Sequence, residues 1–393
     1  MGGPLEGLKI LDFTSLLPGP YATMYLCDMG ASVLKVCSPK RLDLADITPP
    51  FINGTKLSAT TAFLGRGKRS ISLNLKDPRA IRIVHRLVAD YDIVVEQFRP
   101  GVMSKLGLGY EDLVKTNPAL TYCSITGYGQ TGPLNAKAGH DINYLARSGL
   151  MSYSGRKESG PVLTGMQIAD VASGSHNAVI GILAAVIGRN QTGKGQHIDI
   201  SMTDGALAFN SYYGAGFLTD GADPQREGNW LNGGSLYDFY ETNDGRYISF
   251  GGLEPQFFEA FCTAVGRPDL IPGGVVTEDI SRIKPEIREI VRSRTQEEWT
   301  RVFQDVDACV EPVLSVSEAL GDGHARSRGL VIEVALPSGE KIRQIANPIK
   351  FSGTPQTYGN AGVPGGPHTK EVVLELGYSE ESYRELEREG VFG

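Results

Sequence analysis

The strongest evidence for the fold lies in residues 8–36, LKILDFTSLLPGPYATMYLCDMGASVLKV. The apolar run 8–13 is typical of a short buried strand. A Pro-Gly-Pro turn follows at Pro18, Gly19 and Pro20, and the pattern then predicts a helix over 21–29 and a second strand over 32–36. The segment therefore predicts a β-loop-α-β unit.

The same alternation continues down the chain, with a predicted helix over 78–90 and predicted strands over 92–96 and 120–125. Alternation of this kind favours an open parallel sheet with helices on both faces, and so an α/β fold. The first loop reads LLPGPYA, without the G-x-G-x-x-G fingerprint of dinucleotide-binding folds. The sequence therefore disfavours an NAD-dependent oxidoreductase.

A second region, about 228–304, has a different pattern. It contains predicted strands over 235–241 and 246–250, then predicted helices around 255–265 and 295–306. This order indicates a smaller α+β domain. Residues 353–368 are rich in Gly and Pro and are expected to form a linker or wrapping loop before a last charged helix over 379–389.

Composition excludes some classes of function. The 393 residues are 41% hydrophobic and 21% charged, with a net charge of −7, which argues against a nucleic-acid partner. The five cysteines are scattered without a C-x-x-C pair, so neither a zinc site nor a disulfide framework is expected. The start, MGGPLEG, lacks a charged leader, and the apolar run 178–187 is short for a membrane span. We expect a cytoplasmic protein with no membrane partner.

The most informative site segment is 164–188, TGMQIADVASGSHNAVIGILAAVIG. Its apolar residues fall largely on one helical face, and Asp170 stands at the expected N-cap of that helix. One interpretation is simple capping, since aspartate is a favoured N-cap residue. The other is chemical, because backbone N–H groups beside this carboxylate could stabilise an oxyanion or an enolate thioester oxygen.

Two further segments carry weaker signals. In GHDINY, residues 139–144, Asp141 also resembles an N-cap, and His140 is either a hydrogen-bonded structural residue or an acid–base group. Glu254 precedes Pro255 at an expected helix start, where a carboxylate is favoured by the helix dipole alone. Each signal by itself leaves the structural interpretation open.

Taken together, motifs spread over the whole chain resemble the family III CoA-transferase and α-methylacyl-CoA racemase superfamily (CaiB/BaiF type). These motifs are PLEGLKILDFTSLLPGPYATMYLCDMGASVLKV, RPGVMSKLGLGYEDL, TGYGQTGP, AGHDINY, TGKGQHIDISMTDGAL, LNGGSLYDFYETNDGRY, DACVEPVL and HTKEVVLELGY. The resemblance implies a Rossmann-like large CoA-binding domain over 1–215, completed by 330–393, and a small α+β domain over 225–325. It also implies that two chains interlock as a homodimer.

The resemblance implies two alternative chemistries for one aspartate, the residue matching Asp170. In the racemases it exchanges the proton alpha to a thioester, while His140, paired with Glu254, serves the opposite face and Asp141 belongs to the catalytic set. In the transferases it forms an acyl-aspartyl anhydride and then an aspartyl-CoA thioester. The His–Glu pair and the short Gly233-Gly234 loop favour a racemase of 2-methylacyl-CoA, and the transferase is the alternative.

One departure from the racemase pattern is the stretch after Asp170, VASGS, which has a single glycine where the racemases commonly have a run. A CoA-ester-binding protein without catalysis is a further alternative, and the retention of the acid–base residues argues against it. The resemblance also implies residues that contact coenzyme A, which enters as part of the substrate and not as a tightly bound cofactor; no metal is expected. These residues are Arg41, Asn74, Lys76, Arg99 and Lys105.

Overall fold

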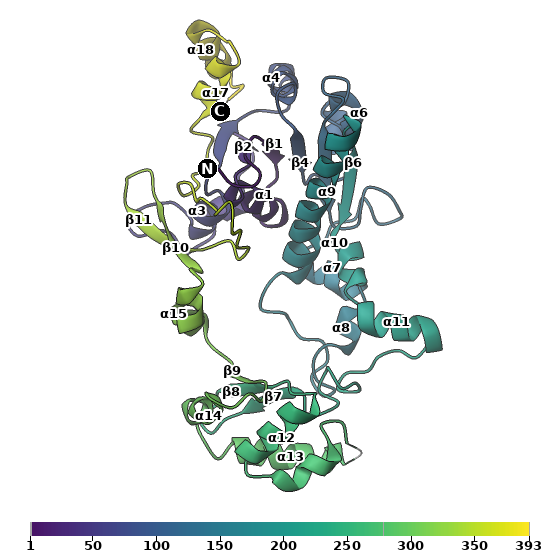
Figure 1. Ribbon diagram of the computed structural model, residues 1–393. Helices are drawn as coiled ribbons and strands as arrows, with labels where there is room; N and C mark the ends of the chain where they lie inside the picture. Colours follow the sequence, from purple (N-terminus) through teal and green to yellow (C-terminus); the bar gives the residue numbers. More distant parts are fainter. Residues whose placement is uncertain (1, 278, 393) are drawn as a thin grey trace. The chain divides into compact units, whose positions relative to one another are not determined.

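The computed structural model describes residues 2–277 and 279–392 (Figure 1). The chain divides into two compact units: unit 1 comprises 1–148, 165–208 and 326–393, and unit 2 comprises 149–164 and 209–325. Residues 149–164, expected in the large domain, are grouped with unit 2 in this division.

Unit 1 is built on a parallel six-stranded sheet in the order β3-β2-β1-β4-β5-β6. Its strands are β1 (Lys9–Phe13), β2 (Ser32–Cys37), β3 (Arg69–Ser72), β4 (Ile93–Glu96), β5 (Thr121–Thr126) and β6 (His197–Ser201). The predicted α/β class with a parallel sheet is confirmed. The order is that of a doubly wound sheet, in which the strand order reverses between β1 and β4.

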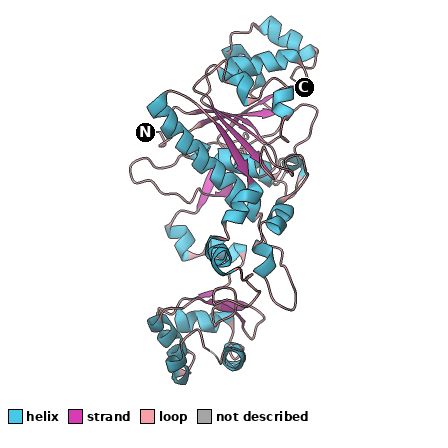
Figure 2. Cartoon of the chain, turned by 90° about the vertical axis from the view of Figure 1, so that its right-hand side faces the viewer, coloured by secondary structure: helices cyan, strands magenta, loops and turns pink. Residues whose placement is uncertain are grey.

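The helices of unit 1 connect these strands, and the strands lie side by side between flanking helices in Figure 2. The connecting helices are α1 (Pro18–Asp28), α2 (Leu44–Ile47), α3 (Ala59–Leu64), α4 (Pro78–Val88), α5 (Val102–Lys105), α6 (Tyr110–Leu113), α7 (Asp141–Arg147), the π-helix η1 (Ala169–His176) and α9 (Asn177–Thr192). Strand β6 is followed directly by α10 (Met202–Ala208). The central strands β4 and β5 are buried along their whole length, as expected for a parallel sheet covered on both faces.

The first helix differs from its prediction. It begins at Pro18, so the Pro-Gly-Pro segment forms its first turn and is not a separate turn before a helix at Tyr21. A proline at the first helical position costs no hydrogen bond, because the N–H groups of the first turn have no partner within the helix.

The C-terminal segment contributes to the core of unit 1. It forms the antiparallel hairpin β10 (Val331–Ala335) and β11 (Lys341–Ile345), then α17 (Thr369–Glu375) and α18 (Glu380–Arg388). Val372 and Val373 of α17 lie in the same buried cluster as Leu11 of β1 and Val94 of β4. The end of the chain therefore stabilises the same sheet that its beginning forms.

Unit 2 contains the antiparallel sheet β7 (Asp238–Glu241), β8 (Tyr247–Phe250) and β9 (Val310–Pro312). Its helices are α8 (Leu150–Tyr153), α11 (Ser211–Asp220), α12 (Pro255–Ala264), the 3-10 helix η2 (Pro268–Gly273), α13 (Ile280–Val291), α14 (Gln296–Phe303) and α15 (Val316–Gly321), and α16 (Gly323–Ser327) crosses to unit 1. Its own core packs Phe250, Phe261 and Trp299. The expected combination of a small sheet and helices is present here.

Together, η1 and α9 form 24 consecutive helical residues, Ala169–Thr192, longer than the apolar run recognised in the sequence. By length and composition alone this segment could cross a membrane, but the core helix of a water-soluble protein meets the same criterion. Here Ala178 and Ile182 are fully buried in the described structure, so part of the helix serves as core.

Candidate active site

The carboxyl ends of the parallel strands form the edge of unit 1 at which ligands are expected. In doubly wound sheets the binding crevice lies outside these ends, beside the point where strand order reverses. In this chain that point lies between β1 and β4. Helix α1, which follows β1, packs against η1, so the turn that carries Asp170 belongs to the same region.

Asp170 lies inside the first turn of the π-helix η1 and is half-buried. The predicted N-cap position is wrong: the N-cap residue is Ile168, because the helix begins two residues earlier than the apolar pattern indicated. Burial, followed by the negative charge of Asp141, raises the pKa of Asp170 to about 7. No described cation forms an ion pair with this carboxyl, so it can exchange a proton near neutral pH.

Asp141 is the residue that the structure brings to Asp170. Its Oδ1 accepts a hydrogen bond from the backbone N–H of Asp170 at 3.0 Å. The prediction of an N-cap at Asp141 is wrong by one residue, since His140 occupies that position and Asp141 is the first residue of α7. Asp141 is therefore not the N-cap of α7, and its side chain instead links the start of α7 to the turn that carries Asp170.

His140 immediately precedes Asp141 and is exposed in the chain. Its backbone N–H donates to Asn143 Oδ1 at 3.0 Å, which fixes the start of α7. Helix α7 packs against η1, and the Asp170 N–H donates to Asp141. The segment that contains His140 therefore lies beside the turn that carries Asp170.

The sequence reasoning missed Tyr144 as a neighbour of this carboxylate. Tyr144 is buried, and its hydroxyl donates to the carbonyl of Gly139 at 2.5 Å. Burial, and after it the nearby charge of Asp170, raises the pKa of Tyr144 to about 12. The signal was present, because residues three apart on a helix share a face and Tyr144 stands three residues after Asp141.

Glu254 lies in unit 2, at the N-cap of α12 directly before Pro255, where the sequence placed it at a helix start. Its side chain is exposed and makes no capping hydrogen bond. Since Glu254 and His140 belong to different units, their pairing stays a prediction.

The expected CoA-contacting residues all follow strands of the unit 1 sheet at its carboxyl edge. Arg41 follows β2, Asn74 and Lys76 follow β3, and Arg99 and Lys105 follow β4. The four cations are exposed, and no ion pair involves any of them within residues 2–277 and 279–392. Exposed cations without carboxylate partners are suited to bind phosphate groups.

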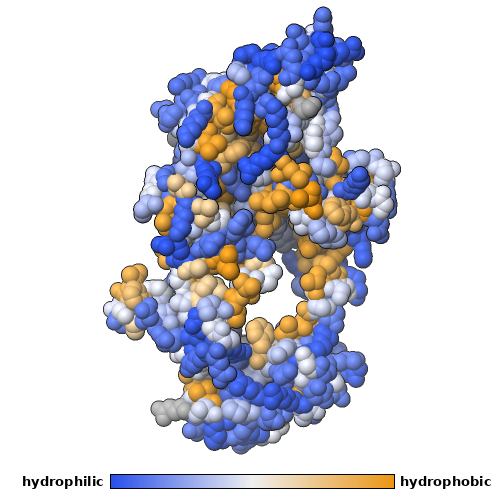
Figure 3. Space-filling model, turned by 180° about the vertical axis from the view of Figure 1, so that it is seen from behind, coloured by the Kyte–Doolittle hydropathy of each residue, from blue (hydrophilic) through white to orange (hydrophobic). Residues whose placement is uncertain are grey.

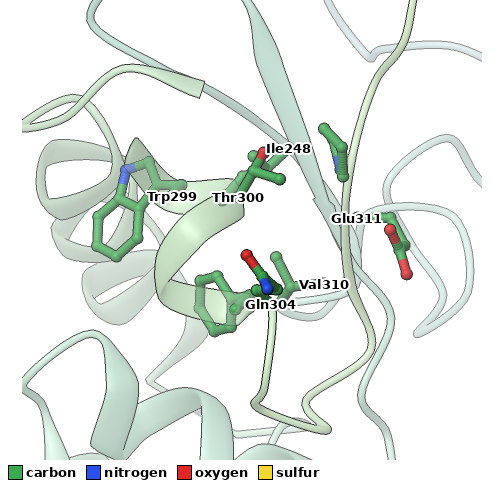
Figure 4. Close-up of a pocket in the computed structure, with 8 residues that line it drawn as sticks. Ile248, Trp299, Thr300, Gln304, Val310 and Glu311 are labelled. Atoms are coloured by element: carbon green, nitrogen blue, oxygen red, sulfur yellow. The ribbon is translucent and has the colours of Figure 1, made fainter. Parts of the chain in front are cut away.

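One small cavity in unit 2, of about 130 Å³, lies between α14, β8 and β9 (Figure 4). It is smaller than the several hundred cubic ångströms typical of small-molecule sites. Trp299, Thr300 and Gln304 line one side, and Val310 and Glu311 line the other. Among the described residues, no cluster of three His, Cys, Asp or Glu side chains could hold a metal ion.

The sheet is doubly wound, and Asp170, whose pKa is raised to about 7, lies near the carboxyl ends of its strands. These two features define the class, an α/β enzyme with a Rossmann-like sheet. The chain belongs to the CoA-transferase family III, whose model matches residues 5–369. It is similar to the human "Alpha-methylacyl-CoA racemase", at 34% identity over 97% of this chain and 96% of that protein. It is equally similar to the mouse "Succinyl-CoA:glutarate CoA-transferase", at 35% identity over 99% of this chain and 90% of that protein.

A solved structure, a CAIB/BAIF family protein from Brucella suis, matches with a TM-score of 0.83 and 29% identity, over 96% of this chain and all of that one. The chain is therefore an enzyme of this family, and both the racemase and the CoA-transferase interpretations are supported.

Proposed function

We propose that this enzyme epimerises the alpha carbon of a 2-methylacyl-CoA thioester by two-base proton transfer. Asp170 exchanges the alpha proton on one face, and His140, assisted by Glu254, exchanges it on the other. The observation that carries the proposal is the hydrogen bond from the Asp170 N–H to Asp141, since it links a carboxyl of raised pKa to the segment that begins with His140.

The raised pKa supports proton transfer in particular. A catalytic acid–base group is most effective when its pKa lies near the working pH, and a pKa of about 7 makes Asp170 a far better base than an ordinary aspartate. The alpha proton of a thioester is weakly acidic, so a stronger base lowers the barrier to its removal.

Coenzyme A is proposed to bind along the carboxyl edge as part of the substrate, with no separate tightly bound cofactor. The exposed cations Arg41, Lys76, Arg99 and Lys105 would contact its phosphates, and Asn74 would donate to polar groups beside them. A cytoplasmic location is part of the same proposal, since free acyl-CoA substrates must reach this edge.

An interlocked homodimer is proposed as the working form. Helix α11 of unit 2 has no buried residue, and its large apolar side chains Tyr212, Phe217 and Leu218 are exposed. Ile180 and Ile187 of α9 are also exposed, and apolar patches are visible on the surface in Figure 3. Exposed apolar helix faces normally lie in an interface. Sedimentation equilibrium is expected to give about twice the 42.3 kDa of one chain, and a monomer would contradict the proposal.

The experiment that tests the reaction follows the alpha proton of a chiral 2-methylacyl-CoA in deuterated buffer by NMR, with no free acid present. We expect exchange with loss of chirality, abolished in Asp170→Ala and lowered about 10²- to 10⁴-fold in His140→Ala. Glu254→Gln is expected to lower the rate about tenfold. Its control, Glu259→Gln, changes an exposed carboxylate of the same helix and should leave the rate unchanged.

The transferase remains the second candidate, favoured by relatives of that kind at the same level of identity. No exchange on several 2-methylacyl-CoA esters, together with transfer of CoA to an added carboxylic acid, would replace the racemase proposal. Mass spectrometry would then be expected to find an acyl or CoA adduct on Asp170.

A further inference from the structure

The turn that carries Asp170 is a π-helix of eight residues, η1, which runs without a break into α9. Segments with i→i+5 hydrogen bonding are rare and occur frequently at functional sites. Such a segment takes more residues per turn than an α-helix, so every residue before α9 is rotated about the helix axis. The direction of the Asp170 side chain therefore depends on this register being kept.

Ser175 is the last residue but one of η1. It is fully buried, and its Oγ lies 2.7 Å from the carbonyl oxygen of Pro18 and 3.1 Å from that of Asp170. The hydroxyl proton can thus be shared between the first turn of α1 and the residue proposed to carry the chemistry. A buried hydroxyl is costly unless it is hydrogen-bonded, so these contacts fix its orientation.

The Pro18 side of this contact is itself held in place. The carbonyl of Pro20 accepts from the buried Nζ of Lys68 at 2.9 Å. The N–H of Gly19 donates to Oε1 of Gln97 at 3.0 Å. The acceptor that Ser175 meets therefore lies on a segment fixed by a second strand connection, and it can serve as a stable reference for η1.

The packing around Ser175 leaves little room for another arrangement. A Cβ added at the neighbouring Gly174 would lie 3.0 Å from Cγ of Met202 and 3.3 Å from Cβ of Pro18. The backbone of η1 thus approaches α1 and α10 closely, and a larger residue at Gly174 would require the Met202 side chain to shift.

We propose that Ser175 is a positioning residue for Asp170, whose hydroxyl holds the π-helical turn in the register that presents the Asp170 carboxyl to the thioester. The inference rests on the proposed function, because it takes Asp170 to be the group that reacts. It accounts for the π-helix at this place and assigns a role to a fully buried serine that takes no part in the proposed proton transfer.

The test compares Ser175→Ala with a matched control, Ser173→Ala. Ser173 is also fully buried in η1 and also donates one short hydrogen bond, to the carbonyl of Met202 at 2.6 Å, but it does not contact the Asp170 carbonyl. Each variant removes one buried hydroxyl donor, which in Ser175 is shared between two carbonyls, so melting temperature should fall by similar amounts in both.

We expect kcat of Ser175→Ala to fall about 10- to 100-fold with KM changed less than about twofold, since a misplacement near 1 Å costs about that much in rate. Ser173→Ala should keep both constants within about threefold. The reaction followed is whichever of epimerisation or CoA transfer the wild-type enzyme catalyses.

Equal losses of kcat in the two serine variants would overturn the positioning role, and so would a change in Ser175→Ala confined to KM. Asp170→Ala separates this failure from that of the proposed function. If Asp170→Ala is inactive while the serine variants behave alike, only the role of Ser175 is refuted. If Asp170→Ala is active, the proposed function fails and the role of Ser175 fails with it.

Discussion

Asp170 in unit 1 and Asp238 in unit 2 are both at least partly buried, but the charges beside them differ in sign. Cations lie beside Asp238, whereas another carboxylate acts on Asp170. Asp238 is bonded to Arg156 Nη2 at 2.6 Å and to Lys284 Nζ at 2.6 Å, and it also accepts from the N–H of Phe239. Burial alone would raise its pKa, but the hydrogen bonds and charges of Arg156 and Lys284 hold the pKa of Asp238 below its usual value. Around Asp170 no described cation offsets burial, and the charge that acts on it is that of another carboxylate, Asp141.

The two environments therefore use a carboxylate in two ways. Lys284 also donates to the carbonyls of Gly233 and Ser235, so Asp238 is the centre of a network that fixes the short glycine loop. Such a group stabilises structure and cannot easily gain a proton. Asp170 costs stability when it ionises, and this is the arrangement expected of a group that performs chemistry.

A third carboxylate shows that a raised pKa alone does not mark a reactive site. Glu96, at the end of β4, is 4% exposed, and burial raises its pKa to about 7. Its oxygens are engaged by the hydroxyl of Ser124 and, at 2.8 Å, by the N–H of Phe98. What distinguishes Asp170 is a raised pKa on a carboxyl that is only partly covered.

The comparison predicts stability changes of opposite sign for two matched substitutions. Asp238→Asn leaves Lys284, whose side chain is 8% exposed, without its counter-charge, and leaves Arg156 paired with Glu227 alone, so the free energy of unfolding should fall by about 2–4 kcal/mol. The pKa of Asp170 rises from 3.8 to about 7 on folding. The protonated carboxyl therefore contributes stability that is fully present below about pH 4 and is lost as the pH rises through 7. Asp170→Asn should therefore raise the free energy of unfolding by about 1–2 kcal/mol at pH 8, after allowance for partial solvent screening.

Urea unfolding at pH 5 and pH 8 measures both changes. The gain in Asp170→Asn should shrink at pH 5, where the wild-type carboxyl is largely protonated, while the loss in Asp238→Asn should persist. A loss of stability in Asp170→Asn at pH 8 would show that its carboxylate is held by favourable contacts, and the distinction between the two regions would not stand.

The sequence predicted the interior of the sheet better than its edges. Strands β1, β2, β4 and β5 were identified because apolar runs fill them, whereas the edge strands β3 (RSIS) and β6 (HIDIS) were not. Each is four or five residues long and contains polar side chains. Burial of β3 depends on tertiary neighbours such as Thr369, whose Oγ1 accepts from the N–H of Ser72 almost 300 residues away.

The sequence predicts Asp170 as a candidate site residue, but it does not predict the geometry around it. Asp170 was singled out as an N-cap, because an apolar face begins directly after it. Its true position inside a π-helix depends on the contact of Ser175 with Pro18, 157 residues away in the chain. A pattern within one segment carries no information about that contact. For the same reason the hydrogen bond between Asp141 and the Asp170 N–H could not be anticipated.

The smallest effect is expected from Asp141→Asn, which separates the charge of Asp141 from its hydrogen bond. An asparagine Oδ1 can still accept from the Asp170 N–H, now at 3.0 Å, but the negative charge is removed. That charge is the second cause of the raised pKa of Asp170, after burial, so the pKa should fall but stay above 3.8. In the direction in which Asp170 removes the proton, the acid limb of the pH profile of kcat/KM should move to lower pH.

Asp141→Ala should shift the acid limb in the same direction and also lower kcat, because the turn is no longer tied to α7. An acid limb that stays in place in Asp141→Asn would mean that burial alone sets the pKa of Asp170, and an upward move would mean that Asp141 stabilises the ionised form.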